Sequence, residues 1–316
     1  MLNFAILSAG NIAGRMARTL DSLRDEVQPY AIAARDSARA QALAGRYGFA
    51  KSFAGYEALL ADPAVDVVYI GSIHPLHAQH IRAALLAGKH VLCEKPLTLN
   101  AAQAQSLFAL ARERGLLLAE AMWTRTLPFA QALRKTLADG RLGAPRLVTA
   151  VLGEAMADIP RIAQPALGGG ALLDIGVYAL QMILYILGKD CRLLSVSGHR
   201  APTGVDDFAA VLLESAEGIA ATATCASGLA GDKKACIYGV NGWIEIPQMM
   251  GAGTYTLHLN GQRPQEIVCS YDHGFRGEVE EFHRLYKEGR IHSEIHSPED
   301  TIRGMELIEQ AMAAIH

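Results

Sequence analysis

Residues 4–13 read Phe4-Ala5-Ile6-Leu7-Ser8-Ala9-Gly10-Asn11-Ile12-Ala13, and this stretch decides the fold of the N-terminal half. The apolar run Phe4–Leu7 predicts a buried strand, and the residues from Arg15 to Leu23 predict a helix. Between them lies Ser8-x-Gly10-x-x-Ala13, a variant of the glycine-rich turn that binds dinucleotides. In this context Gly10 would let a pyrophosphate approach the backbone, and Ala13 would let the helix pack closely on the strand.

The start of this first helix would also supply N–H groups and a positive dipole end for an anion. We therefore expect the turn to bind a cofactor through Ser8, Gly10, Asn11, Ile12 and Ala13. Ser8 departs from the pattern because it must form the turn without the conformational freedom of glycine. The alternative interpretation is an ordinary tight turn between a strand and a helix.

The second expected strand, Tyr30–Ala34, is followed by Arg35 and Asp36. The end of this strand meets the adenine ribose in dinucleotide-binding domains, where an acid favours NAD and an arginine accommodates the 2′-phosphate of NADP. The planar guanidinium of Arg35 would suit that phosphate, so we favour NADP over NAD. Two alternatives remain open: Asp36 could bind the ribose of NAD, or it could cap the following helix and leave Arg35 solvated.

Strand-like and helical segments alternate from Phe4 to Leu118, which predicts a doubly wound parallel sheet. We expect further helices over Ala38–Tyr47 and Ala78–Ala87 and a strand over Val65–Ile70. The loop between that strand and the second of these helices should lie along the cofactor. Its side chains Ser72, His74 and His77 could contact the cofactor, although histidines before a helix more often pack or cap.

Val91-Leu92-Cys93-Glu94-Lys95-Pro96 predicts a short buried strand that stops at a charged pair and a proline. Ligands of open α/β sheets bind outside the carboxyl ends of the strands. Lys95 is therefore expected where an amine can do chemistry, with Glu94 beside it to hold the loop or contact the cofactor. A plain surface turn is the alternative.

These motifs, with residues 120–125 and 168–178, resemble the Gfo/Idh/MocA oxidoreductases. The resemblance is closest to the branch of dimeric dihydrodiol dehydrogenase and NADP-dependent D-xylose 1-dehydrogenase. Many family members have histidine where this chain has Tyr178. The resemblance implies a Rossmann domain, placed at 1–122, and a substrate-binding and dimerisation α/β domain at 123–316 with an open, mainly antiparallel sheet. A homo-oligomer formed through that sheet is expected, and the terminal helix is expected to pack back on the first domain.

The second half of the chain contains strand-like segments in succession, which predict an antiparallel sheet. They are Asp206–Leu213, Gly218–Cys225, Ala235–Val240, Gly242–Ile246 and Tyr255–Leu259. Two terminal helices are expected over Gly277–Tyr286 and Pro298–His316. Upstream, Gly168-Gly169-Gly170 is expected to be the most flexible point of the chain.

Asp174 and Tyr178 are four residues apart and would share one face of a helix. A capped, half-buried helix end is the alternative, but with Lys95 and the glycine turn we favour a catalytic group of Lys95, Tyr178 and Asp174 that converges at the nicotinamide. Asp174 would also bind substrate hydroxyls. Trp123 would offer a flat wall to a ring, with Arg125 near the pocket mouth.

The chemistry expected is hydride transfer between nicotinamide C4 and a carbinol or carbonyl carbon of a sugar or cyclic diol. The amine of lysine and the phenol of tyrosine ordinarily have pKa values of about 10, too high for a base near neutral pH. Burial beside a cationic nicotinamide would lower the pKa of the lysine, and a nearby ammonium would lower that of the tyrosine. The residues do not rank Lys95 against Tyr178 as proton donor. The alternatives are an inositol or amino-sugar dehydrogenase and an NADP-sensing protein without turnover.

Composition excludes several classes of protein. The formal charge of -3 gives no broad basic field for nucleic acid or anionic lipid, and no stretch is expected to span a membrane. Five widely spaced cysteines favour reduced thiols in the cytoplasm, and the N-terminus lacks the pattern of a secretory signal. His273, His283, His292 and His296 lack a coherent ligand spacing, so no metal is expected.

Overall fold

The computed structural model describes residues 1–272 and 274–315, which form two compact units. The first unit contains Met1–Thr98, Ala102–Trp123 and the described residues 274–301; the second contains Leu99–Ala101, Thr124–Asp272 and the described residues from Ile302 onward. His273, considered above as a metal ligand, and His316, expected in the last helix, lie outside the described residues.

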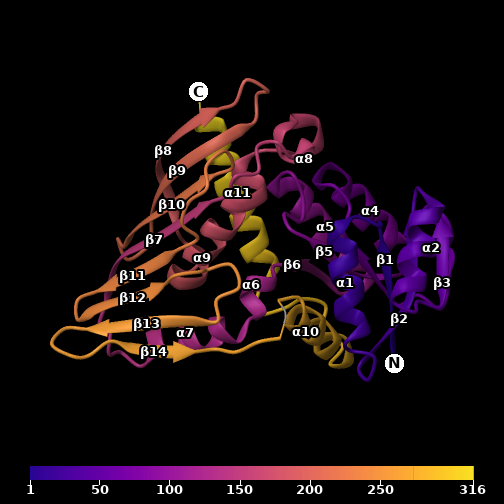
Figure 1. The fold of residues 1–316 in the computed structure, drawn as a ribbon, viewed down its shortest axis with the longest axis horizontal. Helices are drawn as coiled ribbons and strands as arrows, with labels where there is room; N and C mark the ends of the chain where they lie inside the picture. The colour runs from indigo at the N-terminus through magenta and orange to yellow at the C-terminus, as the bar shows by residue number, and fades with distance from the viewer. Residues whose placement is uncertain (273, 316) are drawn as a thin grey trace. The chain divides into compact units, whose positions relative to one another are not determined.

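The first unit is built on a six-stranded sheet with the order β3-β2-β1-β4-β5-β6, in which every strand pair is parallel (Figure 1). The prediction of a doubly wound parallel sheet is confirmed. The strands are β1 (Leu2–Leu7), β2 (Val27–Ala34), β3 (Lys51–Ala54), β4 (Val67–Ile70), β5 (His90–Glu94) and β6 (Leu118–Ala121). Their carboxyl ends share one edge, which is where ligands of such sheets bind.

The helices of the first unit follow the strands in the expected order. They are α1 (Asn11–Asp21), α2 (Ser37–Arg46), α3 (Glu57–Ala61), α4 (His74–Leu86), α5 (Ala101–Arg114) and α10 (Arg276–Lys287). Two helix starts were predicted four residues too late, since α1 begins at Asn11 and α4 at His74. In α4 the reason is Pro75, which is compatible with the first helical turn and does not mark its outside.

One face of this sheet is covered by α1 and α10 (Figure 1). The rings of Phe4 in β1 and Phe282 in α10 meet edge to face with centroids 5.9 Å apart. Phe4, Ile6, Tyr69 and Phe282 are at most 1% exposed. Burial of each such side chain contributes about 1.5–3 kcal/mol, so α10 is an integral part of this unit.

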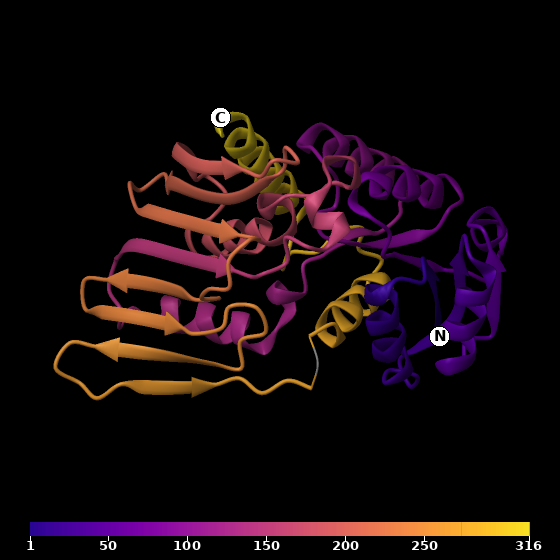
Figure 2. The same cartoon turned by 45° about the horizontal axis from the view of Figure 1, so that its top comes forward.

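The second unit contains an eight-stranded sheet with the order β14-β13-β12-β11-β7-β10-β9-β8, seen side by side in Figure 2. Among the described strands of this second sheet, only the β7–β10 pair is parallel, so the prediction of a mainly antiparallel sheet is confirmed. The strands are β7 (Pro145–Gly153), β8 (Arg192–Arg200), β9 (Asp206–Glu214), β10 (Ala220–Ala226), β11 (Ala235–Gly239), β12 (Gly242–Ile246), β13 (Thr254–Leu259) and β14 (Gln265–Val268).

The helices of this unit include one that is buried along its first eight residues. They are α6 (Trp123–Thr126, whose first residue belongs to the first unit), α7 (Pro128–Ala138), α8 (Pro160–Ala163), η1 (Pro165–Leu167), η2 (Leu172–Gly176), α9 (Val177–Leu187) and α11 (Pro298–Ala314, whose first turn belongs to the first unit). The expectation that no stretch could span a membrane is wrong by length and composition, because Pro165–Leu187 passes that test. Its apolar window is 83% buried inside the protein, as in the core helix of a folded domain.

The end of the chain also differs from the expected arrangement. The Arg200 guanidinium of β8 donates to the carbonyl oxygens of Met312 and Ile315, which holds the end of α11 in the second unit. It is α10, not the last helix, that returns to the first unit.

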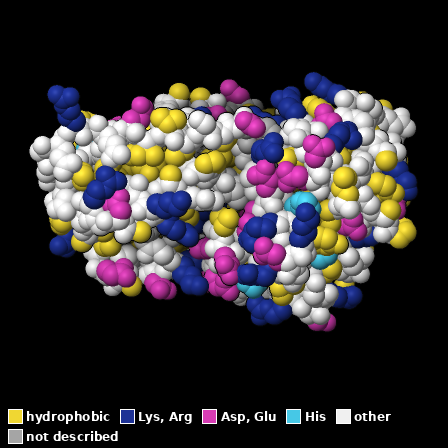
Figure 3. All heavy atoms as spheres, turned by 90° about the horizontal axis from the view of Figure 1, so that it is seen from below, with side chains coloured by type: hydrophobic (Ala, Val, Ile, Leu, Met, Phe, Trp, Pro, Cys, Tyr) yellow, Lys and Arg dark blue, Asp and Glu magenta, His cyan; other side chains and the backbone are white. Residues whose placement is uncertain are grey.

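On the face drawn in Figure 3, side chains of both charge signs are interspersed.

Candidate active site

The turn between β1 and α1 has the strain that its sequence implied. Ser8 adopts φ +124°, a conformation that favours glycine and costs another residue about 1–3 kcal/mol. The surroundings fix it there, because its amide donates to Ala33 O at 2.9 Å and its hydroxyl donates to Gly71 O at 2.8 Å. Ser8 therefore joins the ends of β1, β2 and β4.

The start of α1 is open to a ligand. Gly10 is the N-cap, with φ -82°, and no side chain caps the helix. A Cβ placed on Gly10 would meet no atom within 4 Å, whereas one on Gly71 would lie 2.9 Å from Ile12. The amides at the start of α1 thus face open space while the neighbouring turn packs tightly behind them. This arrangement fits an anionic pyrophosphate.

At the end of β2, Asp36 has the helix-capping role that was one of the alternatives from the sequence. The Asp36 carboxylate accepts from the amides of Ala38 and Arg39 at 3.0 and 3.3 Å, so it caps α2, and Arg35 is exposed. Sequence reasoning missed Arg39, whose guanidinium donates to Ala9 O at 2.8 Å. The signal available was its position in the first turn of a helix that starts at this edge of the sheet.

The segment after β4 contains a histidine that is fully buried. His77 lies 2.9 Å from Pro96 O through Nδ1 and 2.9 Å from Ser72 O through Nε2, and burial lowers its pKa. The packing alternative therefore describes the geometry of His77, while His74 is partly exposed in the same helical turn. The Ser72 hydroxyl is 3.0 Å from Nδ1 of His80, a residue that sequence reasoning overlooked.

Lys95 follows β5 on a loop that is fixed on both sides. It is partly buried, and its peptide bond to Pro96 is cis. His77 contacts Pro96 O, and the next amide, Leu97 N, donates to Glu120 Oε1 at 2.7 Å. The backbone that carries the amine is thus held by two buried side chains.

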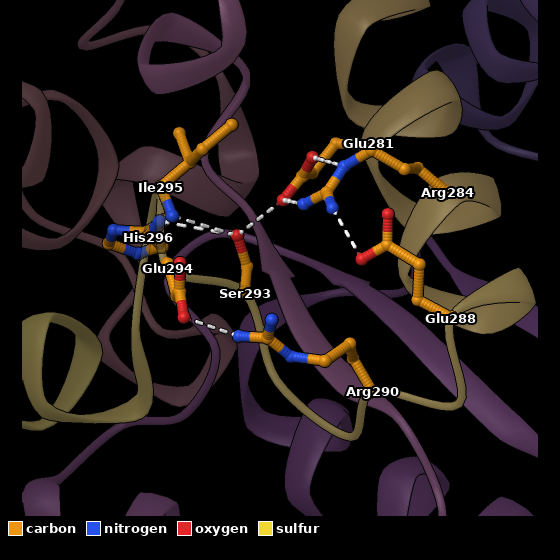
Figure 4. Close-up of polar contacts among 8 residues, drawn as sticks. All are labelled: Glu281, Arg284, Glu288, Arg290, Ser293, Glu294, Ile295 and His296. Carbon is orange, nitrogen blue, oxygen red and sulfur yellow. Dashed lines mark hydrogen bonds and ion pairs between the residues drawn. The ribbon is translucent and has the colours of Figure 1, made fainter.

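Glu120 is in turn held by the chain after α10. Its Oε2 accepts from His296 Nε2 at 2.7 Å and from the Thr301 hydroxyl at 2.8 Å. Burial opposes its ionisation, but these bonds and the Leu97 amide hold the pKa of Glu120 below its ordinary value. Figure 4 shows Ser293 between Glu281 of α10 and the backbone of Ile295 and His296, which orders the histidine.

In the second unit, Asp174 and Tyr178 lie on successive helical elements. Asp174 is in the π-helix η2 and Tyr178 is the second residue of α9; they are 3% and 7% exposed. The Arg161 guanidinium of α8 forms an ion pair with the Asp174 carboxylate and contacts both of its oxygens. Single π turns are frequent at functional sites. No sequence motif pointed to Arg161.

The expected flexibility of Gly168-Gly169-Gly170 is not what the backbone shows. All three residues are buried, Gly168 has φ +71° and Gly170 has φ +117°. A Cβ on Gly170 would lie 2.2 Å from an oxygen of Asp206, so glycine is required for close approach. Asp206 accepts from Leu172 N at 2.7 Å, and burial raises its pKa to about 6.

The two expected substrate-binding side chains beside the unit boundary are more buried than predicted. Trp123 is partly buried and packs against Phe275 in the first unit, with ring centroids 6.0 Å apart. Arg125 is 5% exposed, donates to Gln181 Oε1 at 2.8 Å and stacks over the Tyr185 ring. The cavity beside it is about 10 Å³, room for at most one water, and its expected position near the mouth of a substrate pocket stays a prediction.

The structure thus groups the predicted residues in two sets. Lys95, Glu94, Ser72, His74 and His77 and the turn at Gly10 belong to the first unit, at the carboxyl side of its strands. Asp174 and Tyr178 belong to the second unit with Arg161. Convergence of Lys95, Asp174 and Tyr178 at the nicotinamide stays a prediction. Within residues 1–272 and 274–315, no group of three histidine, cysteine or acidic side chains could hold a metal ion.

Comparison with known proteins identifies the family of the chain. A model described as an oxidoreductase family with an NAD-binding Rossmann fold matches residues 2–122, and the GFO/IDH/MocA C-terminal domain matches residues 130–245. The chain belongs to the Gfo/Idh/MocA oxidoreductase family. The Rossmann turn at Gly10 and the Lys95 loop are therefore parts of an NAD(P)-dependent oxidoreductase, as the sequence predicted.

Relatives in this family match most of the chain. Human trans-1,2-dihydrobenzene-1,2-diol dehydrogenase is 38% identical over 281 residues, which cover 86% of this chain and 84% of that protein. The Danio rerio enzyme of the same name is 35% identical over 323 residues, covering 98% and 96%. A 3-ketoreductase from Actinomadura kijaniata, solved with NADP and TDP-benzene, is 29% identical, with TM-score 0.92 and coverage of 100% and 98%. The expected branch within the Gfo/Idh/MocA family is confirmed.

Proposed function

We propose that this oxidoreductase uses NADP to transfer hydride to or from a carbinol or carbonyl carbon of a sugar or cyclic diol. The observation that carries the proposal is Lys95 at the carboxyl end of β5, on a loop held by His77 and Glu120, in a chain related to dihydrodiol dehydrogenases. NADPH would supply the hydride in reduction, and NADP⁺ would accept it in oxidation. The protein would bind the diol and move the hydroxyl proton.

NADP fits the residues at the ends of β1 and β2. The uncapped start of α1 suits the pyrophosphate, and the exposed Arg35 is where a guanidinium could pair with the 2′-phosphate. Arg39 contributes a second guanidinium at Ala9. Oδ1 of the Asp36 carboxylate accepts from two amides of α2, which supports the capping role over a role in binding the ribose of NAD. A ketoreductase similar to this chain was solved with NADP.

Three side chains would handle the substrate. Lys95 and Tyr178 are the candidates for moving the hydroxyl proton, and either could do so while the other stabilises the alkoxide. Asp174 would accept hydrogen bonds from substrate hydroxyls, with its carboxylate oriented by Arg161. The chemistry is then ordinary acid–base assistance of hydride transfer.

The open face of the second sheet supports a homo-oligomer. The exposed side chains Val151, Leu212, Tyr238 and Trp243 all lie on this face, as the strand register shows. In analytical ultracentrifugation the wild type should therefore sediment as an oligomer, and Leu212→Asp should dissociate it. A monomeric wild type would contradict the proposed oligomer. Five free, buried cysteines support a reducing compartment, and we propose the cytoplasm.

The proposal is tested by a cofactor-matched screen, NADP against NAD, over pentoses, hexoses, inositols and trans-dihydrodiols. Turnover of a diol or aldose with NADP is the expected result. Preference for inositols or amino sugars would assign a different dehydrogenase of the family. Tight dinucleotide binding with no turnover on any substrate would identify an NADP sensor and refute the proposed reaction.

A further inference from the structure

A buried carboxylate lies behind Lys95 in the first unit. Glu94 ends β5 and is 7% exposed. It shares a sheet face with Leu92, which pairs with Tyr69 of β4, so Glu94 lies one step nearer the carboxyl edge on that face. The Tyr69 hydroxyl donates to Glu94 Oε1. Glu94 therefore points to the side of the sheet that α1 and α10 cover.

A second carboxyl group reaches this side from α10. Glu278 is the third residue of that helix and lies one turn before Phe282, which packs on Phe4 of β1. Glu278 is 4% exposed, and within the described part of the chain neither of its oxygens has a hydrogen-bond partner. An ionised carboxylate in such a place costs several kcal/mol, so the group is stable there only when it carries a proton.

Tyr69 of β4 lies on the same sheet face as Glu94 and interacts with both acids. Lys95 follows Glu94 in the chain, whereas Cys93 and its register partner Glu120 of β6 lie on the opposite face of the sheet and interact with Glu94 only through charge. Burial raises the pKa of Glu94, while the Tyr69 hydroxyl and the Lys95 charge favour its ionised form. Burial and then repulsion from Glu94 raise the pKa of Glu278 well above its ordinary value. Of the two acids, Glu94 is thus the one that ionises and Glu278 the one that keeps its proton.

Glu94 lies at the carboxyl end of β5, on the edge where the proposed NADP would bind, and the inference rests on that proposed function. The nicotinamide ring is cationic when oxidised and neutral when reduced, so a negative charge nearby favours the oxidised form. We propose that Glu278 tunes the cofactor: it would keep its proton when the neutral, reduced cofactor is bound and would release that proton to solvent when the cationic, oxidised cofactor is bound. Only the carboxyl O–H bond breaks, and the charge of the carboxylate balances that of the ring.

The test compares dissociation constants of NADP⁺ and NADPH across neutral and alkaline pH. In the wild type, rising pH removes the Glu278 proton, so NADP⁺ should gain affinity relative to NADPH by up to about tenfold per pH unit. Glu278→Gln resembles the neutral acid but has no proton to release. In this variant the ratio of the NADP⁺ and NADPH dissociation constants should therefore vary much less with pH. Glu280→Gln is the matched control, because Glu280 is a partly exposed carboxylate on the same helix and pairs with Arg276.

A second measurement begins with the free wild type, so its first result does not depend on cofactor binding. Infrared spectroscopy of the free wild type, at a pH where Asp206 is ionised, should show a protonated carboxyl band. The band should weaken on addition of NADP⁺ and persist with NADPH; it should be lost in Glu278→Gln and kept in Glu280→Gln. Absence of the band, or an unchanged pH dependence in Glu278→Gln, overturns the proposal. If neither dinucleotide binds, the proposed function fails as well, whereas a band present in the free protein still establishes the protonated acid.

Discussion

The residues around Lys95 form a support that reaches across the first unit. His77 contacts Pro96 O and Glu120 accepts the Leu97 amide, while His296, 176 residues away in sequence, holds Glu120. Each partner is buried, so the loop backbone cannot relax without exposing or unpairing a polar group. An amine on such a fixed loop is preorganised for proton transfer, which is the condition for efficient catalysis.

Arg161 gives a prediction for substrate affinity. Its guanidinium is partly exposed and contacts both oxygens of the buried Asp174 carboxylate. Arg161→Ala should raise the KM for a diol substrate about tenfold, the cost of one charge-assisted hydrogen bond, with NADP affinity unchanged. Steady-state kinetics with saturating NADP measure this. Arg192→Ala, which removes the exposed ion pair with Glu214, serves as the control and should leave KM unchanged. A KM that stays constant or falls in Arg161→Ala would show that Asp174 does not need its partner.

Asp206 gives a prediction for stability. Its folded pKa of about 6 lies above the ordinary 3.8, so the folded state binds a proton more tightly than the unfolded state. The protonated form stabilises the fold at low pH, and this contribution is lost as pH rises through about 6, by about 3 kcal/mol in total. Denaturant unfolding of wild type and Asp206→Asn should therefore show a difference that grows from pH 4 to about pH 7. A difference that is flat over this range would mean that Asp206 is not titrating as described.

A functional residue could be predicted when its role depends on its neighbours in the sequence, and not when its role depends on contacts with distant parts of the chain. Ser8, Gly10 and Lys95 were found because a local pattern of strand, turn and helix gives each a place at the sheet edge. Arg161, His296 and Glu278 were missed because their partners are far away in sequence or on another element. The contacts of Arg125 with Gln181 and Tyr185 were missed for the same reason, since only the folded chain brings these residues together.

At the scale of elements, the strands that the sequence did not reveal have a common position. β3 ends the first sheet, and β8 and β14 are the two ends of the second. Edge strands bury less surface than central strands, so they lack the continuous or alternating apolar pattern by which central strands are identified. The exposed residues of β8 and β14 show this directly. By contrast, the central strands β1, β2, β4 and β5 of the first sheet and β9 to β13 of the second were predicted within a few residues.

The start of α1 allows a prediction in which binding and stability separate. A Cβ meets no atom within 4 Å at either Gly10 or Gly45. Gly10→Ala should leave stability nearly unchanged but weaken NADP binding roughly tenfold or more, because the methyl group would occupy the space the pyrophosphate needs. Gly45→Ala, inside α2, should raise stability by about 0.5–1 kcal/mol and leave affinity unchanged. Fluorescence titration and thermal unfolding measure the two effects. Unaltered affinity in Gly10→Ala would place the dinucleotide elsewhere.

At the scale of the whole molecule, the chain order does not follow the division into units. The first unit is completed by α10, which comes after the entire second sheet, and α11 then belongs mainly to the second unit. No local sequence pattern predicts that α10 belongs to the first unit, because an amphipathic helix can cover either sheet equally well. The fold class could be predicted from the alternation of elements, whereas the order of the strands and the assignment of the last two helices required the folded structure.

Lys95 and Tyr178 are expected to serve one chemical step although they belong to different units. The most direct test is the stopped-flow rate of NADPH formation with a diol substrate in Lys95→Met, Tyr178→Phe and the double variant. Each single change should slow hydride transfer at least about a hundredfold with NADP affinity nearly intact, and the double variant should be little slower than the worse single one. Wild-type rates in Lys95→Met, or losses that multiply fully in the double variant, would contradict a shared step.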